Sequence, residues 1–387
     1  MKKIYLDYAA TTPVDTRVLK AMEPYFNKKF GNTMGLYSLG LEAKKALEDS
    51  RKTVAKFMKA GSEEIVFTGS ATESINSVLK GIAFANKGKG KHIITSSIEH
   101  HAVLETCKWL EKQGFEITYL PVDNYGFINL IQLENAIRKD TILVSIMHAN
   151  NEIGTIEPIK DIGKICSNHD VYFHTDAVQS FGKMPIDVNK MNIDLLSLSA
   201  HKFYGPKGVG ATFVRKGVKI EPLLHGGGHE FGLRSSTSNI AGVVGLAKAV
   251  KLRKKEMKSE TKKLTKLRDR LIEGVLKIEN SHLNGHPTMR LSNNANFWFS
   301  FIEGESLVVQ LDSYGIMGST GSACSSDTLE PSHVLRAIGL KHEEAHGSLR
   351  LTLGKYNTKA DIDYVLKVLP KIVKKLRKIS PFKGKWN

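Results

Sequence analysis

Cysteine is scarce in this chain, and its spacing excludes two kinds of stabilised protein. The three cysteines are Cys107, Cys166 and Cys324, and no two of them form a CxxC pair. Structural zinc sites and disulfide frameworks both need more, and more closely spaced, cysteines. The sequence therefore argues against both, and we expect no metal site.

Long apolar runs are also missing. No stretch approaches the roughly 20 apolar residues of a membrane-spanning helix. The first residues, MKKIYLDYAATTPVD, are basic but lack the apolar core of a signal peptide. We therefore expect a cytoplasmic protein that does not act at a membrane. Its 387 residues are enough for one large core or two domains.

Acidic residues are fewer than basic ones. The chain has 56 Lys and Arg against 39 Asp and Glu, a net charge of +17 that can attract nucleic acid or an acidic partner. Much of the excess lies in residues 248–271 and 367–387. In the first of these, apolar residues recur at helical spacing, so the lysines are best interpreted as a solvated helix face. No zinc finger, RNA-recognition signature or stacking-aromatic pattern accompanies the charge.

Short β-rich runs alternate with helical patterns from about residue 43 to 215. This alternation predicts an α/β fold with a mainly parallel sheet flanked by helices. A long helix is expected over 245–278, followed by short strands and a basic helix over 359–377. We predict a large domain over residues 15–260 and a smaller α+β domain built from 1–14 and 261–387. In such sheets, ligands bind at the carboxyl ends of the strands.

Polar residues follow several predicted strands, and each is ambiguous alone. Gly69–Glu73 opens a helix and reads either as a phosphate cup or as a plain N-cap. His100, Asn151 and Asp176 each have an ordinary structural reading as well. A lysine in Lys202's place, after an apolar strand, is either a snorkelling surface residue or a lysine that holds an aldehyde.

Together these strand ends point to one site. A phosphate cup, an aromatic platform in His100, a carboxylate in Asp176 and the amine of Lys202 are the parts that a pyridoxal phosphate site needs. The carboxylate would keep the pyridine nitrogen protonated, and the lysine would hold the aldehyde and shuttle protons.

The segment Gly318–Asp327 places Cys324 among small, flexible residues. Cys107 and Cys166 lie in apolar patterns typical of buried cysteines, whereas this setting suits an accessible nucleophile. A cysteine in an unimportant loop is the alternative, and the neighbouring cofactor constellation makes it less attractive.

The combination SAHK, GPKG and GSAC resembles the NifS/IscS group of cysteine desulfurases, which are class V aminotransferase-like enzymes of the fold-type I pyridoxal phosphate superfamily. The resemblance extends almost end to end, through YLDYAATTPVD, EHHAVLETC, HTDAVQS, HGGGHE and EEAHGSLRLTLG. It implies a homodimer that converts L-cysteine to L-alanine and leaves the sulfur as a persulfide on Cys324. An iron–sulfur scaffold, another acceptor protein or a tRNA-thiolation partner would then receive the sulfur.

The resemblance also implies roles for single residues. Lys202 matches the lysine that binds the cofactor, His100 the ring that stacks on it and serves as a base, and Cys324 the persulfide-forming cysteine. Asp176 matches the partner of the pyridine nitrogen, and Gln179 the donor to the phenolic oxygen. The remaining matches are phosphate-side positions (Ala71, Thr72, Ser199, His201), a phosphate contact reaching in from the second subunit (Thr237), a cofactor and substrate contact (Asn151) and the arginine that grips the substrate carboxylate (Arg350).

The chain departs from the family pattern in places. Gly69-Ser70 stands where Ser-Gly is usual, and Phe231 and Ser236 replace an Arg or Asn and a Gly. Thr33 and Tyr37 stand where a Pro and a His are usual. Selenocysteine lyase, an ordinary class V aminotransferase and a basic scaffold protein with an inactive enzyme fold remain alternatives.

Overall fold

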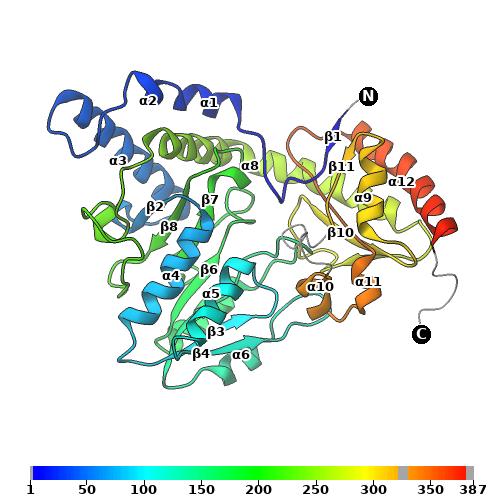
Figure 1. Ribbon diagram of the computed structural model, residues 1–387, viewed down its shortest axis with the longest axis horizontal. Coiled ribbons are helices and arrows are strands. Elements are labelled where there is room, and N and C mark those ends of the chain that lie inside the picture. The colour runs from blue at the N-terminus through cyan, green and yellow to red at the C-terminus, as the bar shows by residue number, and fades with distance from the viewer. Residues whose placement is uncertain (1–2, 321–329, 381–387) are drawn as a thin grey trace.

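The structure is a computed structural model that describes residues 3–320 and 330–380. It contains a large sheet with helices on both sides and a smaller sheet covered by further helices (Figure 1). The described helices are α1 (Thr16–Met22), α2 (Pro24–Asn27), α3 (Ser38–Met58), α4 (Ala71–Ala85), α5 (His101–Glu111), α6 (Leu130–Ala136), α7 (Ile159–Asn168), α8 (Ile240–Val275), α9 (Gly304–Asp312), α10 (His333–Ala337), α11 (His342–His346) and α12 (Lys359–Ile379).

The large sheet has the strand order β2-β8-β7-β6-β5-β3-β4. Its strands are β2 (Ile65–Thr68), β3 (His92–Ser96), β4 (Glu116–Leu120), β5 (Thr141–Ser145), β6 (Tyr172–Asp176), β7 (Leu195–Ser199) and β8 (Gly210–Val214). Strands β4, β3, β5, β6 and β7 are parallel, so their carboxyl ends lie along one edge of the sheet. Strand β8 pairs antiparallel with both β2 and β7, because the turn after β7 returns the chain directly beside that strand.

Each face of this sheet is buried by its own helices. On one face α3, α7 and the start of α8 contribute residues such as Met58, Ile162 and Leu246 to a large apolar core. On the other face α4 and α5 contribute Val78 and Leu110 to a second core. Parallel strands covered on both faces read as continuous apolar runs, which is the pattern of TILVS in β5.

The smaller part of the molecule has its own core. Its sheet has the order β12-β10-β9, with β9 (Ser281–Asn284), β10 (Asn294–Phe299) and β12 (Ser348–Thr352) antiparallel. The N-terminal strand β1 (Ile4–Tyr5) pairs with β11 (Ile316–Met317), more than 300 residues away in the sequence. Ile4 and Leu6 are buried in this core with the inner faces of α9 and α12.

The long helix α8 belongs to both parts. Its first turns, up to Val250, are buried against the large sheet, and its last turns, from Leu264, are buried in the smaller core. At 1.5 Å per residue, its 36 residues extend over about 54 Å. The domain boundary near residue 260 stays our proposal.

Two local expectations differ from the structure. The helix expected over LIQLENAIRK ends at Ala136, because Ile137 is extended and the Arg138 N–H is bound by the Thr141 hydroxyl. The long helix begins at Ile240 rather than at residue 245. The Asn239 side chain caps its first turn by accepting from the Gly242 N–H. Among the described residues, no helix is both long enough and apolar enough to cross a membrane.

Candidate active site

A cavity of 470 Å³ lies at the carboxyl ends of the parallel strands. The segments that follow β2, β3, β5, β6 and β7 all reach it, as does Arg350 of β12. Of the residues predicted from the sequence, the structure brings the following to this cavity: Ala71, Thr72, His100, Asn151, Asp176, Gln179, Ser199, His201, Lys202 and Arg350.

One end of the cavity is the first turn of α4. Ser70 caps this helix by accepting from the Glu73 N–H at 3.1 Å, and Glu73 accepts in return from the Gly69 N–H at 2.9 Å. The backbone N–H groups of Ala71 and Thr72 belong to the first helical turn and have no partner within the helix. The exchange of Gly69 and Ser70 relative to the family pattern thus supplies a side-chain cap, and the helix keeps its affinity for anions.

Asp176 ends β6 and is 5% exposed. Within the described part of the chain, the only hydrogen bond to its carboxylate comes from the Val178 N–H at 2.8 Å. Burial raises the pKa of this carboxyl to about 6, although Lys202 opposes the rise. A buried carboxylate with so little compensation is stabilised by a cationic N–H group in the cavity.

His100 caps α5, and its Nδ1 accepts from the Ala102 N–H at 3.1 Å. Burial lowers the pKa of His100 to about 4, with further lowering by Lys202, His101 and His333. The ring is therefore neutral near pH 7, and the hydrogen bond to Nδ1 leaves its proton on Nε2. His100 thus offers a flat uncharged face and one N–H to the cavity.

Lys202 reaches back to the N-terminal segment. Its Nζ donates to the carbonyl oxygens of Ala9 at 2.6 Å and Ala10 at 2.8 Å. The Ala9 oxygen also accepts from Nε2 of Gln179 at 3.0 Å. These contacts place the amine of Lys202 and the amide of Gln179 next to each other on one wall of the cavity.

The same N-terminal segment holds His201. The Thr11 hydroxyl and His201 Nδ1 share a hydrogen bond of 3.0 Å, and Thr12 binds the His201 carbonyl through both its N–H and its hydroxyl. Burial, together with Lys202 and other lysines, lowers the pKa of His201 to about 4.

Arg350 lies in β12 and is 3% exposed. It donates to the Asn151 carbonyl at 3.1 Å and to Asp7 at 3.0 Å. Its Nε is buried and has no partner among the described residues. Because buried guanidinium donors are costly to leave unpaired, this edge of the cavity favours a carboxylate ligand.

One predicted residue, Thr237, is not among those that line this cavity. Thr237 lines a neighbouring space of 140 Å³ with Arg234 and Ser236, so its predicted contact from a second subunit stays a prediction. Cys324 lies outside the described residues. Before residue 321, Ser319 exchanges backbone hydrogen bonds with Arg350, which lines the cavity. After residue 329, Ser332 donates to the buried Glu152.

Several cavity residues were not singled out from the sequence: Ala9, Ala10, Thr11, Met147 and Lys207. Asp7, the partner of Arg350, was missed as well. For Ala9, Ala10 and Thr11 the only sequence signal was the resemblance through YLDYAATTPVD, since no local pattern links residue 9 to residue 202.

The residues present fit pyridoxal phosphate. The first turn of α4 suits a phosphate, the buried carboxylate of Asp176 suits a protonated ring nitrogen, and the amine of Lys202 suits an aldehyde. His100 and Gln179 line the same cavity.

The sequence matches the aminotransferase class-V family over residues 4–365. It is 60% identical over 384 residues to a protein of Methanosarcina thermophila named cysteine desulfurase IscS. The aligned residues cover 99% of this chain and 95% of that protein. A protein of Dictyoglomus turgidum with the same name is 56% identical over 386 residues, covering 100% of this chain and 98% of the relative.

Solved structures agree. A NifS-like protein superimposes with a TM-score of 0.92 at 42% identity, over 97% of this chain and 100% of that one. A structure described as SspA in complex with cysteine superimposes with a TM-score of 0.81 at 41% identity, over 92% and 100% of the two chains. The chain therefore belongs to the aminotransferase class-V family of pyridoxal phosphate enzymes, in its group of NifS- and IscS-like cysteine desulfurases.

Proposed function

We propose that this protein is a cysteine desulfurase in which Lys202 binds the cofactor, Arg350 binds the carboxylate of L-cysteine, and Cys324 accepts the sulfur. The observation that carries the site assignment is the convergence of Lys202, Asp176 and Arg350 on one cavity, although they come from the end of β6, the segment after β7 and the middle of β12. When bound, pyridoxal phosphate supplies a ring that withdraws electrons from the substrate α-carbon.

The chain's own residues supply the rest of the chemistry. Asp176 holds the ring-nitrogen proton, because a buried carboxylate is stabilised by an adjacent cation. Lys202 moves the proton of the substrate α-carbon once its amine is free. His100 covers one face of the ring and donates a hydrogen bond from Nε2 while it is neutral.

Sulfur transfer requires a second nucleophile. The Cys324 thiolate attacks the substrate sulfur, so that a sulfur–sulfur bond forms and the bond between sulfur and Cβ breaks. The bonding pair stays on carbon, which takes up a proton, and L-alanine leaves. A free thiol with a pKa of about 8.5 is only a few per cent thiolate at pH 7, so a basic group near the cysteine speeds the step.

The partners belong to the same proposal. The neighbour solved with cysteine supports cysteine as substrate. An iron–sulfur scaffold or a tRNA-thiolation protein would take the sulfur from Cys324, and the net charge of +17 favours an acidic acceptor. We propose a cytoplasmic homodimer, with Thr237 of one subunit completing the phosphate side of the other site.

An absorbance and mass experiment tests the assignment. Lys202→Ala should abolish the visible band of the lysine-bound cofactor and all sulfide release. Cys324→Ala should keep the band but lose sulfide release by at least about 10²-fold, since a covalent nucleophile is removed. The wild-type protein treated with cysteine should gain the mass of one sulfur on the peptide containing Cys324.

Other results would change the conclusion. Full sulfide release by the Cys324→Ala protein would remove that residue from the reaction. Faster turnover of selenocysteine than of cysteine would identify a lyase for that amino acid. Keto-acid formation with an amino acceptor would identify an aminotransferase.

A further inference from the structure

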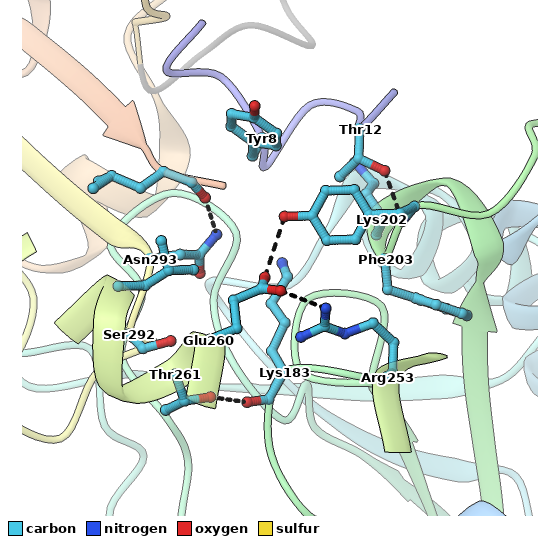
Figure 2. A pocket seen from close by; sticks show the side chains of 13 residues that line it. Tyr8, Thr12, Lys183, Lys202, Phe203, Arg253, Glu260, Thr261, Ser292 and Asn293 are labelled. Carbon is cyan, nitrogen blue, oxygen red and sulfur yellow. Dashed lines mark hydrogen bonds and ion pairs between the residues drawn. The ribbon is translucent and has the colours of Figure 1, made fainter. Parts of the chain in front are cut away.

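A second lysine lies behind the wall that carries Lys202. Lys183 lines a small space of 10 Å³, room for about one water, which Lys202 also lines. In Figure 2 the Lys183 side chain extends into this space between Glu260 and Arg253. Neither the sequence motifs nor the proposed reaction assigns a role to Lys183.

The amine of Lys183 makes one described hydrogen bond. It donates to Oε1 of Gln179 at 3.1 Å. Glu260, the nearby acid, is already engaged, because one oxygen accepts from Arg253 at 2.5 Å and the other from the Tyr204 hydroxyl at 3.2 Å. The amide oxygen of Gln179 is thus the acceptor on which the amine of Lys183 depends.

Gln179 is therefore held from both ends of its amide. Its oxygen accepts from Lys183, and its nitrogen donates to the Ala9 carbonyl at 3.0 Å. A flipped amide would set NH₂ against a donor and oxygen against a carbonyl oxygen, so both contacts would become repulsive. Gln179 is 5% exposed, so water cannot replace either partner freely.

We propose that Lys183 is a positioning residue that fixes the amide of Gln179 with its NH₂ group toward the cofactor cavity. This inference rests on the proposed function, in which Gln179 donates to the phenolic oxygen of the cofactor. With Lys183 removed, the Ala9 carbonyl alone distinguishes the two amide orientations. The NH₂ group of Gln179 would then point away from the cofactor cavity for part of the time.

The charged surroundings agree with this role. Burial is the largest cause that lowers the pKa of Lys183, which reaches about 7. The groups that face it are Lys202, Arg253 and Arg350, which lower its pKa, and Glu260, which raises it. A buried lysine among other cations is stabilised by a hydrogen-bond acceptor. That acceptor is the Gln179 oxygen, which belongs to the side chain that Lys183 orients.

The test is a pH titration of the visible absorbance of the cofactor-loaded protein. An N–H donor stabilises the deprotonated, negatively charged oxygen, so its loss raises the pKa of the chromophore. Lys183→Met removes donor and charge, whereas Lys183→Gln removes the charge but keeps an N–H donor. We expect the chromophore of the Lys183→Met protein to bind its proton about tenfold more tightly than the chromophore of the Lys183→Gln protein does. Lys262→Met, an exposed lysine of α8, should titrate like the wild type.

Each outcome decides. Equal shifts in Lys183→Met and Lys183→Gln would assign the effect to charge alone and overturn the positioning role, as would the absence of any shift. Circular dichroism shows whether each variant is folded, and Lys183→Leu, which also removes donor and charge, replaces the Met variant in the comparison if that variant does not fold. Sulfide release by the wild type reports on the proposed function separately, because the titration requires only bound cofactor.

Discussion

Two buried glutamates lie directly beside residues of the cavity wall in the sequence. Glu99 precedes His100, and Glu152 follows Asn151. Glu99 accepts from the Ser96 hydroxyl at 2.6 Å and the Met147 N–H at 2.9 Å, yet burial raises its pKa to about 8. Burial likewise raises the pKa of Glu152 to about 7. The folded protein therefore carries protons that the unfolded chain releases near pH 4.5.

This difference predicts how stability changes with pH. Because the folded pKa of Glu99 is raised, its contribution is complete below about pH 4.5 and is lost as the pH rises through 8. The buried histidines His148 and His174 have lowered pKa values and titrate below about pH 6.5, outside the upper part of this window. Glu99→Gln should therefore reduce the loss of unfolding free energy between pH 6.5 and 8 by about 1 kcal/mol.

Urea unfolding at pH 6.5 and at pH 8 measures the loss of unfolding free energy between these two values. The exposed Glu273→Gln on α8 is the matched control and should keep the wild-type slope. An unchanged slope in Glu99→Gln would contradict the buried, protonated state of Glu99.

Single residues also show what the sequence could and could not predict. Asp176 and Lys202 were predictable, because each follows an apolar strand and the ends of parallel strands meet at one edge. Lys183 and Asp7 were not, because their roles depend on contacts with Gln179 and Arg350 that no local pattern records. Side-chain partners far apart in the sequence become visible only after packing.

At the scale of elements, the connection between β8 and α8 (residues 215–239) is held to α3 by a buried ion pair. Arg51 donates to both oxygens of Glu230, at 2.6 and 2.9 Å, and Glu230 also accepts from the Phe67 N–H. The Arg51 guanidinium lies 4.8 Å from the ring centre of Phe231, whose φ is +59°. Phe231, a departure from the family pattern, thus covers this ion pair.

A double-mutant cycle tests how strongly this connection is held. Glu230→Ala and Arg51→Ala should each lower the unfolding free energy by about 3 kcal/mol. The first leaves the buried Arg51 with the more exposed Glu48 as its acidic partner, and the second leaves the buried Glu230 carboxylate without its guanidinium. The double variant should cost about 1–3 kcal/mol less than the sum. Asp49→Ala, which removes an exposed partner of Lys52 on the same helix, should cost less than about 0.5 kcal/mol. Strict additivity of the first two changes would contradict the coupling.

The element pattern itself was largely predictable. Alternating periodicities indicated the strands and helices of the large sheet, and Gly and Asn residues marked many of their ends. The pairing of β1 with β11 was not, because two-residue strands carry no periodicity. The helix α6 was predicted, but its end was placed too late, since Ile137 continues the apolar pattern after the helix has ended.

At the scale of the whole molecule, apolar side chains gather on the surface between α2 and the start of α3. Leu36 is 91% exposed, and Phe26, Phe30, Met34 and Tyr37 are each at least 60% exposed. Contiguous exposed apolar surface is typical of an interface. A second copy of this chain is the partner we propose for it.

Leu36→Asp should therefore weaken the dimer and shift the mass toward the 42.9 kDa monomer in light scattering. Ile131→Asp, an equally apolar exposed position on α6, should leave the mass unchanged. A wild-type protein that is monomeric at micromolar concentration would contradict the proposed assembly.

The helix α8 makes a second prediction at this scale, because it is buried in both cores. Ser259 is exposed on its middle turns, between the two buried stretches. Ser259→Pro should cost about 3 kcal/mol or more and divide one calorimetric transition into two. Ser259→Ala should keep a single transition, and a single transition in both variants would show that the cores are coupled by other contacts.

The N-terminal segment that receives Lys202 has a consequence for biosynthesis. Residues 4–12 leave the ribosome before the segments with which they pair, which are β11, β12 and the segment after β7. Closing contacts across more than 300 residues is slow. The wall of the cavity therefore cannot be complete until Thr352 has been synthesised, and a nascent chain paused before that point would hold its lysine without the carbonyl groups that receive it.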